Sequence, residues 1–229
     1  MAQRYTARQG ENPVDEGQAP RNDVASPLPL GLGLFALATA LLGCYYAGFV
    51  IRYDQPSARF ALGAMLIGIS IALILAGMWE FRKNATLNAT IFTSYGGFLL
   101  ALGLFYTPSL GVFGTVSTLG VIPLMLGLFF LCWTIYTAIL TLGAYSVNSS
   151  FTVILGLLCL AFLVLTIGQL AGANVALRII GGWIAIICAL VAWAGMAMSI
   201  MERTHTQENF HWSLGDQEER RGHRIPATD

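Results

Sequence analysis

Residues that could bind a solute recur in this sequence at the spacing of a helix face. They fall in three apolar segments: Thr39, Tyr45 and Tyr46; Thr90, Thr93, Ser94 and Tyr95; and Thr134, Thr137 and Thr141. Residues three, four or seven positions apart share one face of a helix. A hydroxyl there either bonds the carbonyl one turn back and packs, or contributes to a narrow polar passage between helices. The sequence leaves both uses open.

Asp, Glu, Lys, Arg and His are absent from those apolar segments. The nearest is Glu80, which is followed by Arg82 and Lys83. Ionisable groups inside a membrane mark proton relays and ion pumps, so the sequence disfavours a proton pump built from a series of carboxylates. Glu80 has two interpretations: a solvated ion pair at the membrane edge, or a carboxylate in the vestibule of a passage.

The four cysteines show no spacing that would bind a metal or form a redox motif. They fall one to a segment, at Cys44, Cys132, Cys159 and Cys188. An isolated cysteine in such a segment is typical of packing. We therefore expect no metal site, no cofactor and no catalytic residue, and we predict that the protein is not an enzyme.

The elements that must position these residues follow from composition. The chain has 229 residues, of which 56% are hydrophobic and 10% charged, and its net charge is zero. Seventeen of the 24 charges lie in the tails, residues 1–27 and 201–229. Six uncharged apolar stretches remain, at 28–51, 60–79, 89–106, 119–143, 151–171 and 179–200. Each is long enough to cross a hydrocarbon core of ~30 Å.

This pattern predicts an all-α membrane protein with six transmembrane helices in residues 28–200, short loops and disordered polar tails. It excludes a soluble enzyme, and the balanced charge indicates no nucleic-acid partner. Both tails and two loops would share the side that carries nine Lys and Arg residues, against three on the other side. Basic residues favour the cytosolic side, so we expect cytosolic termini and a plasma-membrane location.

Small residues recur at Gly181, Ala185 and Ala189, at intervals of four in the sixth stretch. This spacing allows close helix approach. It is compatible with tight packing inside one protomer and with a contact between subunits.

Several segments together resemble the acetate uptake transporter family, the succinate–acetate permeases of bacteria with their fungal and algal relatives. These segments are Ser-Pro-Leu-Pro-Leu-Gly-Leu at 26–32, Ala-Gly-Met-Trp-Glu-Phe at 76–81 followed by Thr-Ile-Phe-Thr-Ser-Tyr-Gly at 90–96, Leu-Thr-Ile-Gly at 165–168, and Gly-Trp at 182–183. Their order and spacing fit the family across about residues 26–200. The chain departs from it at Ser26, at Tyr46 and in the Asn-Ala-Thr-Leu turn at 84–87.

The resemblance implies six-helix protomers assembled as a homo-hexamer in the lipid bilayer, each with its own pore for acetate and related short monocarboxylates. It assigns the hydrophobic constriction of the pore to Phe35, Tyr95 and Leu158. It also links Ala192 to substrate choice.

The predicted function is therefore a transporter or channel for acetate and similar monocarboxylates, with succinate as a further candidate and with proton-linked flux. The residues expected to line the pore or set selectivity, besides Ala192, are Thr39, Thr93, Ser94 and Thr134, with Glu80 in the vestibule. A bare carboxylate in hydrocarbon is costly, so the cargo must be the protonated acid or an anion solvated by hydroxyls and helix N-termini. Two alternatives remain: a channel for a small neutral solute such as urea or ammonia, and a membrane sensor that transports nothing.

Overall fold

The computed structural model describes residues 25–49, 55–107 and 121–222, and within these ranges the chain is entirely helical apart from short turns. The helices are α1 (Leu28–Ala47), α2 (Pro56–Arg82), α3 (Thr86–Tyr106), α5 (Ile122–Tyr145), α6 (Ser149–Leu170) and α7 (Val175–Gly222). In this described part, six helices are long and apolar enough to cross a membrane. The predicted all-α membrane fold is confirmed. Most of the predicted amino-terminal tail, residues 1–24, lies outside the described residues.

Helix starts and ends follow local chemistry. Proline occupies the first turn of α1, α2 and α5, where the backbone N–H groups have no helical partner to lose. Asn148 caps α6, where its Oδ1 accepts a hydrogen bond of 2.9 Å from the backbone N–H of Ser150. Gly48 ends α1 in the left-handed conformation, with φ +66°.

The helices extend past the charges that the sequence pattern treats as boundaries. α2 includes Arg59 and Glu80, and α7 includes Arg178. Propagating an existing helix costs little, so a charge near a membrane edge does not end it. The predicted spans are therefore shorter than the helices at these points.

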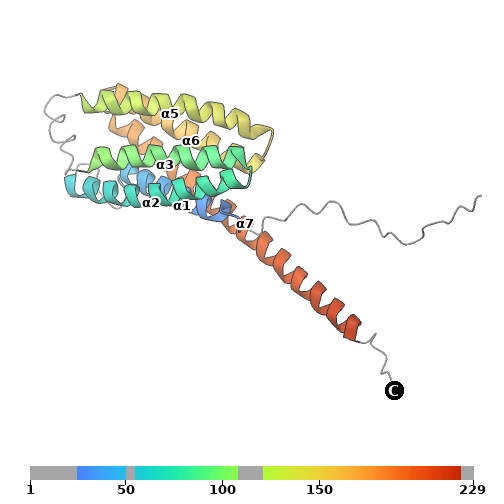
Figure 1. Cartoon of the computed structure of the whole chain (residues 1–229). Helices are drawn as coiled ribbons and strands as arrows, with labels where there is room; N and C mark the ends of the chain where they lie inside the picture. The colour runs from blue at the N-terminus through green and yellow to red at the C-terminus, as the bar shows by residue number, and fades with distance from the viewer. Residues whose placement is uncertain (1–24, 50–54, 108–120, 223–229) are drawn as a thin grey trace, which may run out of the picture.

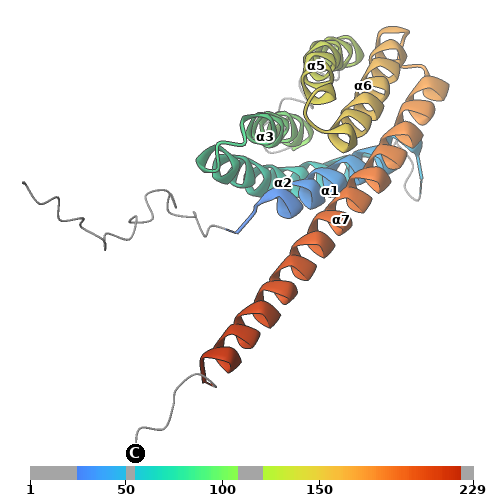
Figure 2. The same ribbon diagram turned by 90° about the vertical axis from the view of Figure 1, so that its right-hand side faces the viewer.

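Three helix pairs form the bundle (Figure 1, Figure 2): α1 packs against α7, α2 against α3, and α5 against α6. Further contacts join α6 to α7 and α1 to α2. In two of the pairs the helices touch through glycine. A Cβ added at Gly63 of α2 would lie 2.9 Å from the carbonyl oxygen of Gly103 in α3, and one added at Gly43 of α1 would lie 2.9 Å from that of Gly182 in α7.

The small residues of α7 pack inside the protomer. Gly181 faces Leu165 of α6, whose Cγ would lie 2.8 Å from an added Cβ, and Ala185 and Ala189 are buried. Of the two uses that the sequence leaves open for this spacing, the structure therefore shows tight packing inside one protomer.

α7 is 48 residues long and projects well beyond the bundle (Figure 1, Figure 2). The prediction that the carboxy-terminal tail is disordered is therefore wrong for residues 201–222. Glu, Gln and Arg, all good helix formers, recur there, and residues 201–222 contain no proline. A helix nucleated in the membrane can continue through such a segment.

Candidate functional site

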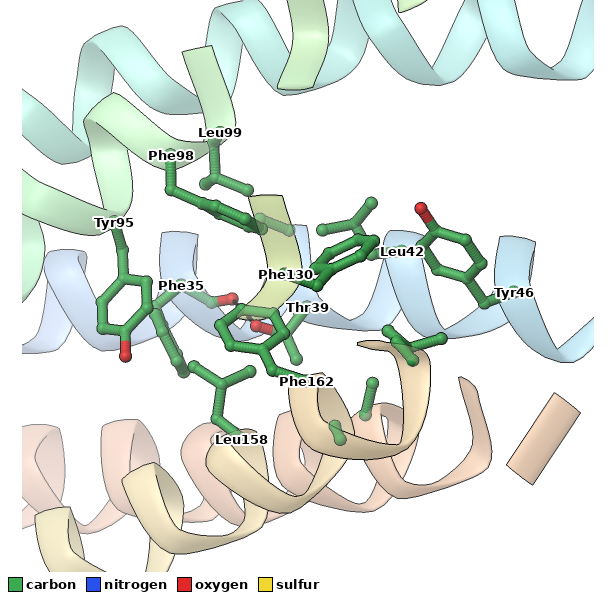
Figure 3. Close-up of a pocket in the computed structure, with 14 residues that line it drawn as sticks. Phe35, Thr39, Leu42, Tyr46, Tyr95, Phe98, Leu99, Phe130, Leu158 and Phe162 are labelled. Carbon is green, nitrogen blue, oxygen red and sulfur yellow. Dashed lines mark hydrogen bonds between the residues drawn. The ribbon is translucent and has the colours of Figure 1, made fainter. Parts of the chain in front are cut away.

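The bundle encloses a cavity between α1, α3, α5, α6 and α7 (Figure 3). Its lining residues are Phe35, Ala38, Thr39, Leu42, Tyr46, Tyr95, Phe98, Leu99, Phe130, Leu158, Ala161, Phe162, Leu165 and Ala185. The cavity volume is about 30 Å³. A single water molecule needs roughly 10–15 Å³ on this scale, so the cavity is narrow.

The cavity is elongated along α1. Phe35 and Tyr46 both line it, and they lie eleven positions apart along the helix, a rise of about 16 Å. Figure 3 shows Phe35, Tyr95 and Leu158 together at one end and Tyr46 at the other. We call the end formed by Phe35, Tyr95 and Leu158 the narrow end.

At the narrow end, the structure brings together the three residues that the family resemblance assigns to a constriction. They come from α1, α3 and α6, and each is less than 5% exposed. The rings of Phe35 and Tyr95 meet edge to face with centroids 5.3 Å apart. The hydroxyl of Tyr95 lies 2.7 Å from Oγ1 of Thr137, which in turn donates to the carbonyl oxygen of Trp133 at 2.7 Å.

The middle of the cavity has an aromatic wall formed by Phe98, Phe130 and Phe162. Their ring centroids are separated by 5.2 Å (Phe98–Phe162), 5.8 Å (Phe130–Phe162) and 6.3 Å (Phe98–Phe130). None of these three residues is among those predicted from the sequence. Helical spacing offered a signal for two of them, because Phe98 follows Tyr95 by three positions and Phe162 follows Leu158 by four.

Hydroxyls supply the polar surface of the cavity. Thr39, a predicted lining residue, lines it, and its Oγ1 donates to the carbonyl oxygen of Phe35 at 2.7 Å. At the far end, the hydroxyls of Tyr46 and Tyr106 lie 2.6 Å apart. Because aromatic and aliphatic groups make up the rest of the lining, the cavity suits a small solute with few polar atoms and disfavours hydrated ions.

Two of the predicted lining residues on α3 face elsewhere. Thr93 lies against Gly77 of α2, and its hydroxyl has no hydrogen-bond partner among the described residues. Ser94 donates to the carbonyl oxygen of Thr90 at 2.6 Å. Since successive helical residues are about 100° apart, Ser94 lies about 100° and Thr93 about 200° around α3 from Tyr95, so neither shares its face.

Thr134 and Ala192 are buried but do not line the cavity. Thr134 donates to the carbonyl oxygen of Phe130 at 2.7 Å and lies 3.5 Å from the hydroxyl of Thr166. Ala192 is fully buried within the hydrophobic core. Neither is among the lining residues, so any influence on a solute in this cavity would be indirect.

Buried polar groups lie near the helix ends. Glu80 is 2% exposed, so it does not lie on a solvated face, contrary to one of its two interpretations. Its neighbour Arg82 lies over the ring of Trp79, 5.0 Å from the centroid. Two further polar side chains that were not predicted from the sequence, Gln169 and Arg178, are also buried.

Comparisons with known proteins agree with this architecture. Residues 9–212 match the model of the GPR1/FUN34/yaaH family. The chain is 32% identical over 170 residues to the succinate-acetate/proton symporter SatP of Escherichia coli, covering 74% of this chain and 85% of the relative. It is 30% identical over 200 residues to the ammonia transport outward protein 2 of Saccharomyces cerevisiae, covering 84% of this chain and 67% of that one.

A solved structure described as the bacterial acetate channel SatP has the same fold. It matches with a TM-score of 0.67 and 29% identity, over 79% of this chain and 94% of the channel. The chain spans 61% to 67% of the length of several fungal relatives that it matches. The family model covers the membrane helices and the cavity they enclose, so the predicted relationship is confirmed and the chain belongs to the GPR1/FUN34/yaaH family of membrane proteins.

Proposed function

We propose that this protein carries acetate and related short monocarboxylates across a membrane. One observation carries the proposal: Phe35, Tyr95 and Leu158, contributed by three helices, lie together at one end of a narrow and mostly apolar cavity. The names of two relatives support it, one an acetate channel and the other a succinate-acetate/proton symporter. Succinate is a second candidate substrate.

In this proposal, Phe35, Tyr95 and Leu158 form the constriction of the passage. Three large side chains at one level exclude water and hydrated ions by dewetting, while a solute of two or three carbons can pass between them as the side chains move. No charged residue is among those that line the cavity in the described part of the chain. Because an unpaired carboxylate is costly to bury, we propose that the acid crosses with its proton.

Flux of labelled acetate into proteoliposomes tests this function. The full-length protein should raise the initial rate above that of protein-free liposomes, which is the necessary control because acetic acid crosses lipid by itself. Propionate in excess should compete with acetate, and urea should not. A rate equal to that of protein-free liposomes would overturn the proposal and would favour the non-transporting sensor.

Ammonia transport is the second candidate function. Neutral ammonia is small and would fit a narrow cavity without charged lining residues, and one relative is named for outward ammonia transport. The same proteoliposomes can report ammonia entry through alkalinisation of a trapped pH dye. Ammonia flux without acetate flux would favour this function over the first.

We also propose a homo-hexamer in the plasma membrane with both termini in the cytosol. The hexamer follows from the family resemblance, and the orientation follows from the nine basic residues on one side against three on the other. Asn84 and Asn148 are exposed at helix ends that would face the cytosol. Cysteines placed there should resist a membrane-impermeant reagent added to intact cells, and rapid labelling would reverse the orientation.

A further inference from the structure

The hydrogen bonds around Tyr95 determine which way its hydroxyl proton points. The Tyr95 hydroxyl and Oγ1 of Thr137 are 2.7 Å apart, and either atom could be the donor. Oγ1 of Thr137 is also 2.7 Å from the carbonyl oxygen of Trp133, which can only accept. A threonine hydroxyl has a single proton, so it can donate to one of these two neighbours.

Two arrangements are possible, and one makes an additional hydrogen bond. If Thr137 donates to Trp133, Tyr95 donates to Thr137 and both protons are used. If Thr137 donates to Tyr95, its bond to Trp133 is lost and the Tyr95 proton has no partner in this chain of groups. Tyr95 and Thr137 are 2% and 0% exposed, and a buried polar group without a partner is costly. The first arrangement is therefore favoured.

In the favoured arrangement, the Tyr95 proton is donated to Thr137, so only the lone pairs of the Tyr95 oxygen remain for another partner. Thr39 behaves in the same way, because its single proton is donated to the carbonyl oxygen of Phe35 at 2.7 Å. Both residues line the cavity. Where a solute reaches either hydroxyl, that hydroxyl can accept a hydrogen bond but has no proton left to donate.

This polarity distinguishes a carboxylic acid from its anion. A protonated acid has an O–H group that can donate to Tyr95 or Thr39, whereas a carboxylate only accepts. To bind the carboxylate, Tyr95 must turn its proton away from Thr137, which breaks its hydrogen bond to Thr137.

We propose that Thr137, which does not line the cavity, is a positioning residue that holds the Tyr95 hydroxyl as an acceptor and thereby makes the narrow end selective for the protonated acid over its anion. The inference rests on the proposed function, since it assumes that monocarboxylic acids pass through this cavity. It adds a positioning residue behind the cavity lining and gives a physical reason why the acid crosses with its proton. The same polarity admits other neutral donors, including ammonia.

The test compares Thr137→Val with two controls. Valine keeps the shape of threonine but removes its hydroxyl, so Tyr95 loses its acceptor and its proton becomes available to a carboxylate in the cavity. Thr137→Ser keeps a hydroxyl at the same position. Thr141→Val removes a hydroxyl one turn away, where Oγ1 donates to the carbonyl oxygen of Thr137 and makes no recorded contact with Tyr95.

The measurement is the initial rate of labelled acetate influx at pH 7, where the anion is in large excess over an acid whose pKa is near that of Glu, about 4.3. A potassium gradient with valinomycin sets the membrane potential to inside-positive or inside-negative. Entry of the neutral acid is insensitive to the potential, whereas entry of the anion is faster when the inside is positive. The rate of protein-free liposomes is subtracted throughout.

We expect equal rates at both potentials for the wild type, Thr137→Ser and Thr141→Val. Thr137→Val should gain a potential-dependent component, with anion flux raised roughly 2- to 10-fold, the range that one hydrogen bond supplies. Adding Tyr95→Phe to Thr137→Val should abolish that gain, because the freed proton is then absent. A merely widened cavity would keep it.

Three results would overturn the inference. Potential-dependent flux in the wild type would show that the anion already crosses, although the proposed transport of acetate would stand. A well-folded Thr137→Val with no potential dependence would show that Thr137 does not control the proton, and Thr137→Ala replaces it if the valine variant does not fold. Absence of any protein-dependent acetate flux would overturn the proposed function together with this inference.

Discussion

The contacts between paired helices and the lining of the cavity are built in opposite ways. Between α1 and α7, and between α2 and α3, glycines bring backbone against backbone with no room for another carbon. The cavity is lined instead by large side chains, most of them aromatic or branched aliphatic. A backbone cannot move aside for an added atom, whereas a lining side chain can be shortened. The comparison indicates that the glycine contacts determine whether the bundle assembles, and the lining side chains determine what it admits.

The largest expected effect comes from adding a carbon to a glycine contact. In Gly182→Ala the new Cβ would lie 2.8 Å from both the Cα of Ala47 and the carbonyl oxygen of Gly43. Because these are backbone atoms of α1, the two helices must separate, at a cost of about 3 kcal/mol. We expect a much lower thermal midpoint in detergent, or loss of the folded protein.

Gly97→Ala is the matched control for that change. Gly97 is also helical, in α3, but nothing lies within 4 Å of a Cβ added there. Alanine favours a helix over glycine by about 1 kcal/mol, so this variant should match or exceed the wild-type midpoint. Equal midpoints for Gly182→Ala and Gly97→Ala would show that the α1–α7 contact tolerates expansion.

The next effect is on selectivity and comes from shortening the lining. Phe35→Ala or Leu158→Ala removes a large side chain from the narrow end, so larger acids such as lactate should enter proteoliposomes faster, relative to acetate, than with the wild type. A core truncation of this kind costs roughly 2–5 kcal/mol, so each variant must first be shown to fold. Leu160→Ala, on the same helix but 47% exposed, should leave the lactate-to-acetate ratio unchanged. An unchanged ratio in both folded narrow-end variants would remove these residues from the constriction.

Much of the fold could be predicted from the sequence because membrane helices are specified by length and apolarity. The described part of the chain has six such helices, and their inexact ends have a physical cause: a helix continues past a charge that can reach water or a buried partner. Glu80 and Arg178 were therefore placed outside the spans, although both lie in helices and are buried.

The site was less accessible to sequence reasoning. Phe35, Tyr95 and Leu158 were proposed from the family resemblance, and no pattern of spacing would have brought three distant segments together. Helical periodicity could have extended that set to Phe98 and Phe162. It could not show which neighbour a hydroxyl faces, because that depends on how the helices pack. Thr39 and Thr93 look alike in sequence, yet one lines the cavity and the other faces α2.

The smallest expected effect compares these two threonines. Thr93→Val should leave acetate flux unchanged and raise the thermal midpoint slightly, because it replaces a buried hydroxyl that has no partner among the described residues by a methyl group of similar size. The gain in stability should be about 1 kcal/mol. Thr39→Val, chemically the same change, removes an acceptor from the cavity and should slow acetate flux roughly 2- to 10-fold. Flux in proteoliposomes and melting in detergent measure both variants side by side. If Thr93→Val slows acetate as much as Thr39→Val does, the hydroxyl facing α2 also contributes to the passage, and the division between helix contacts and cavity lining fails at α3.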